Sequence, residues 1–178
     1  PAAAAGSAAS CRSAAADEYL AAASERGVEV VVLADHNAAA WVGPMVEAGG
    51  RHGIHVFPGV EVTTASGADG AHLIIFADQT NSEADFAAML ASVCGFNVDH
   101  PPFQPNGNPA AAPRTMPQIL DDLPDEYLAI APHAFNDNGI ASEQTIEGDL
   151  RWKALHHGQL SAIDVGDASG LLSGTGFK

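Results

Sequence analysis

Three short apolar runs in this chain each lead into a residue whose side chain can bind a metal ion. Apolar runs of about four to eight residues that are bounded by turn signals predict buried β-strands. In α/β folds, side chains at the carboxyl ends of such strands converge on the ligand site. Imidazoles and carboxylates delivered there from several strands are what a multinuclear metal site requires. The runs are Val30-Val31-Val32-Leu33 before Asp35-His36, His55-Val56-Phe57 before Pro58-Gly59-Val60-Glu61, and Leu128-Ala129-Ile130-Ala131 before Pro132-His133.

Helical and strand patterns alternate along the chain, which predicts an α/β fold, either a barrel or an open parallel sheet. The β-α-β order of residues 28–57 requires a right-handed crossover. The turn-rich residues 66–70 predict an antiparallel hairpin, and the Pro-, Asn- and Gly-rich span 95–114 predicts a lid or binding loop. The predicted helices are residues 13–26, 40–52, 82–93, 116–123 and 146–156, and the predicted strands are 28–33, 54–57, 60–64, 71–76, 127–131 and 160–165.

The length and net charge of the chain limit its possible domain organisation and binding partners. With 178 residues the chain is one domain or most of one, and we expect a flexible Ala-rich segment at residues 1–12 before a folded domain at residues 13–178. The net charge of −15, with only seven Lys and Arg, argues against a basic nucleic-acid-binding surface. A phosphate-bearing substrate is still compatible with this charge, because two or three divalent cations in the site would make the local potential positive. Without a bilayer-spanning apolar run or a secretory signal pattern, a cytoplasmic location is expected.

Four residues are the candidate metal ligands: His36, Glu61, His72 and His133. Glu61 lies in an otherwise apolar stretch, where an unpaired carboxylate is costly, and the chain offers few basic partners for it. A hairpin would bring His72 to the same end of the sheet as Glu61. Asp35 is the candidate general base, with helix capping as the alternative.

Two acidic residues, Asp164 and Asp167, end the last predicted strand, and Asp167 is the better placed for the site, with turn capping as its alternative role. Other histidines lie at predicted helix ends, where an imidazole favours the helix dipole. These are His52, His156 and His157.

The order and spacing of these motifs resemble those of the polymerase and histidinol phosphatase (PHP) superfamily. The resemblance covers residues 15–170 and implies a distorted (β/α)7 barrel that carries up to three Zn, Mn or Fe ions. It also implies that Glu61 bridges two ions, that His72 and His133 complete one of them, and that His36 holds the third. The motifs are Ala34-Asp35-His36-Asn37, Pro58-Gly59-Val60-Glu61-Val62-Thr63-Thr64, Ala71-His72-Leu73 and Ala131-Pro132-His133.

Two motifs of that superfamily are absent from the chain. An opening His-x-His motif should precede the first helix, yet no histidine occurs before His36. A closing Asp-x-His motif should follow the last strand, yet no histidine occurs after His157. We therefore expect a barrel that is incomplete in this chain and truncated at both ends, and the resemblance is compatible with a longer protein that carries an AAA-type ATPase.

The leading functional hypothesis is a metal-dependent phosphoesterase that acts on a phosphorylated small molecule or a nucleic-acid end, with Asp35 and Glu61 as catalytic residues. With part of the ligand set absent, the chain by itself is expected to be nearly inactive. One alternative is a non-catalytic regulatory module attached to an ATPase or a polymerase. Another is metal-dependent amide or ring hydrolysis. No Gly-x-Ser-x-Gly elbow of a serine hydrolase occurs.

Overall fold

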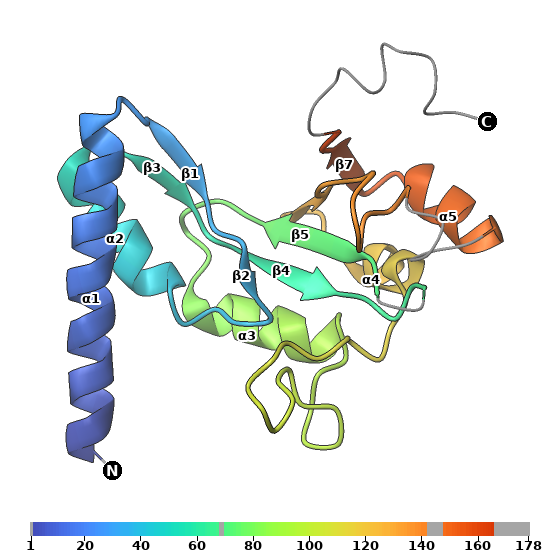
Figure 1. Cartoon of the computed structure of the whole chain (residues 1–178), viewed down its shortest axis with the longest axis horizontal. Helices are drawn as coiled ribbons and strands as arrows, with labels where there is room; N and C mark the ends of the chain where they lie inside the picture. Colours follow the sequence, from blue (N-terminus) through green and yellow to red (C-terminus); the bar gives the residue numbers. More distant parts are fainter. Residues whose placement is uncertain (1, 68–69, 142–147, 166–178) are drawn as a thin grey trace.

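The computed structural model describes residues 2–67, 70–141 and 148–165 (Figure 1). Helices and strands alternate there, so the α/β class predicted from the sequence is confirmed. The helices are α1 (Ala2–Glu25), α2 (Val42–His52), α3 (Glu83–Ser92), α4 (Met116–Asp122) and α5 (Gly148–Leu155). The strands are β1 (Val30–Val32), β2 (Asp35–His36), β3 (His55–Phe57), β4 (Gly59–Thr63), β5 (His72–Phe76), β6 (Leu128–Ala131) and β7 (Leu160–Ile163).

The strands form a five-stranded sheet in the order β2-β4-β5-β6-β7 and a two-stranded sheet of β1 and β3. Strands β1 and β3 pair in parallel, as do β2 and β4, in agreement with the predicted crossover. Strands β4 and β5 form the predicted antiparallel hairpin, and β6 then pairs antiparallel with β5 and parallel with β7.

The two sheets adjoin each other, because only Pro58 separates β3 from β4 and only two residues separate β1 from β2. Proline has no N–H to donate, so it interrupts a strand ladder at its position. Across residues 2–67, 70–141 and 148–165 the strands do not close into a ring. The predicted barrel is therefore not found in the described parts of the chain, where the observed arrangement is an open mixed sheet.

Alternation along the central strands gives the sheet one buried and one half-exposed face. Val60 and Val62 of β4 and Leu73 and Ile75 of β5 are fully buried. They belong to one hydrophobic core with Phe86 of α3, which lies along β4 in Figure 1. The residues between them point to the opposite face because side chains alternate along a strand. Polar side chains therefore have a place on that second face.

Helix α1 is longer than the sequence predicted, since it begins at Ala2 rather than at residue 13. Alanine has the highest intrinsic helix propensity, which accounts for the extension through the Ala-rich segment. The expected flexibility of residues 1–12 is a statement about motion and stays a prediction. Helix α1 packs against α2 (Figure 1), and its residues Ala16 and Leu20 are buried. No helix in the described residues is long and apolar enough to cross a membrane.

Gly59 provides a test of the junction between the two sheets. A Cβ atom at Gly59 would collide with the carbonyl oxygen of Leu33 and lie 2.8 Å from the Cβ of Phe76. We expect Gly59→Ala to lower the free energy of unfolding by about 1–3 kcal/mol, because the strands must separate to admit the methyl group. Urea denaturation measures the change.

Gly50 is the matched control, since a Cβ there meets nothing within 4 Å. Gly50 lies in the last turn of α2, and Gly50→Ala should raise the free energy of unfolding by up to about 0.5–1 kcal/mol. Equal stability of the two variants would contradict the tight junction at Gly59.

Candidate metal centre

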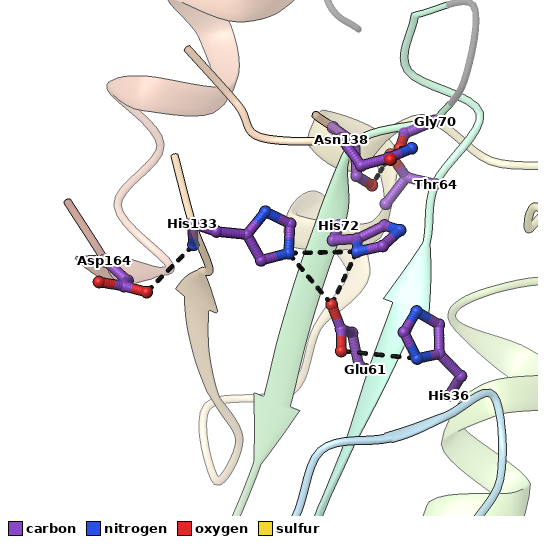
Figure 2. Close-up of polar contacts among 9 residues, drawn as sticks. His36, Glu61, Thr64, Gly70, His72, His133, Asn138 and Asp164 are labelled. Atoms are coloured by element: carbon purple, nitrogen blue, oxygen red, sulfur yellow. Dashed lines mark hydrogen bonds and ion pairs between the residues drawn. The ribbon is translucent and has the colours of Figure 1, made fainter. Parts of the chain in front are cut away.

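The four predicted metal ligands come together on the half-exposed face of the sheet (Figure 2). His36 ends β2 and lies directly opposite Glu61 of β4 in the parallel ladder. His72 begins β5, where it pairs with Thr63, two residues after Glu61 on the same face. His133 follows β6 by two residues. Neighbouring strands thus deliver three imidazoles and one carboxylate to one place.

Both oxygens of the Glu61 carboxylate face imidazole nitrogens. Oε1 lies 2.7 Å from Nδ1 of His72 and 3.5 Å from Nε2 of His133. Oε2 lies 3.6 Å from Nδ1 of His36. The ligand atoms that His36, Glu61 and His72 can offer lie within 4.8 Å of one another. Glu61 is therefore the central residue of the cluster.

The imidazoles also decide the charge state of Glu61. Burial opposes ionisation of this carboxyl group, whose side chain is 13% exposed. The hydrogen bond with His72 and the proximity of His36 and His133 outweigh burial, and they lower the pKa of Glu61 below its ordinary value. Glu61 is consequently a carboxylate at neutral pH.

The imidazole nitrogens and carboxylate oxygens of this cluster are suitable ligands for a divalent metal ion. Nδ1 of His72 and Nε2 of His133 face each other 3.3 Å apart, and two neutral imidazoles can share only one proton at such a contact. Both nitrogens also face the same oxygen of Glu61. Imidazole nitrogen and carboxylate oxygen are ordinary ligands of zinc, iron and manganese. The residues present therefore fit the kind of metal that the sequence resemblance implies.

The backbone of His133 is held in an uncommon conformation, with a φ of 34°. Such positive φ values in residues other than glycine are strained and persist only where surrounding contacts impose them. The backbone N–H of His133 donates to Oδ2 of Asp164 at 3.2 Å, and the N–H of Ala134 donates to the carbonyl oxygen of Asp164 at 2.8 Å. Asp164, just beyond β7, thus fixes the turn that presents His133.

Hydrogen bonds also join the loop after His133 to the start of β5. The backbone N–H of His72 donates to the carbonyl oxygen of Asn138, and the amide of Asn138 donates to the carbonyl oxygen of Gly70 (Figure 2). His72 and His133 are therefore held together through the backbone as well as through Glu61. The contact of Asn138 with His72 was not predicted from the sequence, although the segment Asn136-Asp137-Asn138-Gly139 marks a turn.

Asp35 does not join the cluster. It pairs with buried Val60 in the ladder, so its side chain leaves β2 on the face opposite to that of His36. There it lines a hollow of about 420 Å³ together with Tyr19 and Trp41. Burial raises the pKa of Asp35, and the nearby His36 offsets only part of that effect. The side chain of Asp35 makes no hydrogen bond or ion pair with the side chain of Glu61, and its catalytic role stays a prediction.

The histidines predicted to be structural lie apart from the cluster. His52 contacts Asp17 of α1 at 3.0 Å, His157 contacts Asp121 at 3.0 Å, and His156 stacks on Trp152. Asp167 lies outside the described residues. The neighbouring Asp164 supports the site through the backbone of His133, a role that the sequence analysis did not assign to it.

Comparison with known proteins gives one structural likeness. No protein-family model and no curated protein matches the chain. The chain is similar to a crystal structure from Bifidobacterium adolescentis, at 2.40 Å resolution, of a "putative metal-dependent phosphoesterase". The TM-score is 0.56 at 12% sequence identity, and the likeness covers 83% of this chain and 70% of the other. At this identity the likeness establishes a shared fold.

The raised pKa of Asp35 predicts a pH-dependent effect on stability. A carboxyl group whose pKa is raised by folding destabilises the fold when it is ionised, and the penalty disappears as the pH falls and the group takes up its proton. We expect Asp35→Asn to raise the free energy of unfolding at pH 7–8 by less than about 1 kcal/mol, because the side chain keeps contact with water. The gain should vanish below about pH 4, near the ordinary pKa of an aspartate.

Thermal unfolding of wild type and Asp35→Asn across pH measures this difference. Asp99, in the exposed loop after α3, gives the matched control Asp99→Asn, which should show no such gain. A destabilised Asp35→Asn protein at pH 7–8 would show that the ionised carboxylate has a favourable partner instead.

Proposed function

We propose that this chain is the metal-binding part of a phosphoesterase that uses divalent ions to hydrolyse phosphoester bonds. The observation that carries the proposal is the convergence of three imidazoles on the ionised carboxylate of Glu61. The shared fold with a protein described as a metal-dependent phosphoesterase supports it. The resemblance of the sequence motifs to those of the PHP superfamily points the same way.

In this proposal Glu61 would be a ligand of two ions, His72 and His133 would complete the ligand set of one of them, and His36 would hold the third. Divalent zinc, manganese or iron, when bound, lowers the pKa of a water ligand and neutralises phosphate charge. Glu61 supplies negative charge at the centre because its pKa is lowered. The contacts of Asp164 and Asn138 orient His133 and His72 before any ion arrives, which reduces the reorganisation that binding requires.

The proposed substrate is a phosphorylated small molecule or a nucleic-acid end. A chain with a net charge of −15 and seven Lys and Arg has little basic surface with which to attract a polyanion. Bound cations would therefore provide the positive charge that a phosphoryl group requires. The distorted barrel, the fused ATPase and the cytoplasmic location remain parts of the same proposal.

A second candidate function is a non-catalytic regulatory module attached to an ATPase or a polymerase. The observation in its favour is that Asp35, the candidate general base, leaves β2 on the face opposite to that of the cluster. Such a module would retain metal binding at Glu61 and would lack hydrolysis. Metal content and turnover therefore separate the two functions.

The test of the bridging role is Glu61→Gln. The amide keeps the shape of the side chain but loses the charge that would neutralise two cations. We expect manganese or zinc affinity to fall at least about tenfold and any metal-dependent hydrolysis of bis(p-nitrophenyl) phosphate to fall with it. Equilibrium dialysis with elemental analysis measures the first, and release of p-nitrophenol measures the second.

Glu47→Gln is the control, because it is the same substitution at an exposed position of α2. That variant should keep wild-type metal content. Undiminished metal content in Glu61→Gln would refute the bridging role. If the wild type binds metal but hydrolyses no phosphodiester with any divalent ion, the regulatory module is favoured. If it hydrolyses only amide or ring substrates, metal-dependent amide or ring hydrolysis is favoured.

A further inference from the structure

The hollow that Asp35 lines is separate from the metal centre, because it lies on the face of β2 opposite to that of His36. Residues 31–35 form one side of it, and helix α1 and the beginning of α2 form the others. Its volume is about 420 Å³. Small-molecule sites have volumes in this range, and they are mostly apolar with a few placed polar groups.

The apolar lining of this hollow leads toward a single carboxylate. Val31, Leu33 and Asp35 are alternate residues of one extended segment, so their side chains follow one another on the same face, roughly 6–7 Å apart. Two apolar side chains are thus followed by a carboxylate at the end of the row. The aromatic residues Tyr19 and Trp41 line the same hollow.

The side chain of Asp35 supplies the charge of the hollow. The other lining residues include no Lys, Arg, His, Asp or Glu. Among residues 2–67, 70–141 and 148–165, no hydrogen bond or ion pair engages the Asp35 carboxylate, although the neighbouring His36 influences it electrostatically. Asp35 is an exposed residue, so a molecule that enters the hollow can reach its carboxylate.

We infer that this hollow binds a small organic ammonium ion with an apolar body, with the ammonium group next to Asp35 and the body against Val31 and Leu33. The charge of such a ligand complements that of the carboxylate, and an aromatic ring such as that of Trp41 also attracts cations. The net charge of −15 raises the concentration of cations around the molecule. This site goes beyond the proposed phosphoesterase, because it uses no metal ion and none of the four residues of the cluster.

Other classes of ligand fit this lining less well. An anion such as phosphate would be repelled by Asp35 and would meet no basic side chain in the hollow. A divalent metal ion requires several oxygen or nitrogen ligands, whereas the lining offers one carboxylate among apolar walls. A neutral apolar molecule would remove the carboxylate from water without giving it a partner. The ligand therefore needs both a positive charge and an apolar body.

The experiment compares phenethylamine, an ammonium ion at neutral pH, with phenethyl alcohol, in which a neutral hydroxyl group replaces the amine. The protein is first treated with a chelator, so that the result does not depend on metal binding or hydrolysis. Of the two tryptophans in the chain, Trp152→Phe removes the one in α5, and the fluorescence then reports on Trp41 in the hollow. We expect a saturable change with phenethylamine and binding of the alcohol that is weaker by at least about tenfold.

Asp35→Asn and Asp99→Asn form the first matched pair of variants. Asp35→Asn keeps the shape of the side chain and removes its charge. It should weaken phenethylamine binding by at least about tenfold and leave the binding of phenethyl alcohol unchanged. Asp99→Asn, in the exposed loop after α3, should bind both compounds as the wild type does.

Two exposed alanines of α1 form the second pair, since Ala15 lines the hollow and Ala14 does not. Ala15→Leu should weaken the binding of phenethylamine by at least about tenfold by filling the hollow, whereas Ala14→Leu should bind it as the wild type does. Absence of saturable binding, equal affinity for the amine and the alcohol, or undiminished amine binding by Asp35→Asn or Ala15→Leu would each overturn the inference.

Discussion

The antiparallel register of β4 and β5 is the constraint on which the rest of the site depends. It sets Val62 opposite Leu73 on the buried face, and this leaves Glu61 and His72 together on the other. A slip of one residue would exchange the two faces, burying the carboxylate and exposing the valines. The hydrophobic core therefore fixes the position of the polar cluster, although none of its residues belongs to that cluster.

The geometry of the cluster has a chemical consequence because the side chain of Glu61 is ionised. A carboxylate that is largely removed from water needs compensating charge, and three imidazoles lie close enough to Glu61 to provide it. Imidazoles can offer either a proton or a lone pair, so the arrangement that stabilises the carboxylate also has the ligand atoms that a divalent cation requires. The strained turn at His133, held by Asp164, shows that the backbone is shaped to the position of this ring.

The sequence predicted the hairpin and the four converging residues because both rest on local patterns: alternation, turn residues and the ends of apolar runs. Apolar periodicity did not reveal which face of the sheet carries the site, because adjacent residues of a strand face opposite sides. The side chain of Asp35 leaves β2 opposite to that of His36, and its catalytic role stays a prediction. Barrel closure could not be tested against local patterns because it depends on long-range pairing, and the barrel stays part of the proposal. The role of Asp164 was missed for a similar reason, since its contact with His133 spans 31 positions of the chain.

The most direct test of the central claim is anomalous X-ray scattering from crystals of the protein grown with manganese or zinc. The account predicts anomalous density in contact with Glu61, and with His72 and His133 beside it. Weaker sites elsewhere would not affect the claim. Density at surface pairs such as Asp17 and His52, with none at Glu61 under saturating metal, would contradict the account, because the cluster would then be held together by hydrogen bonds alone.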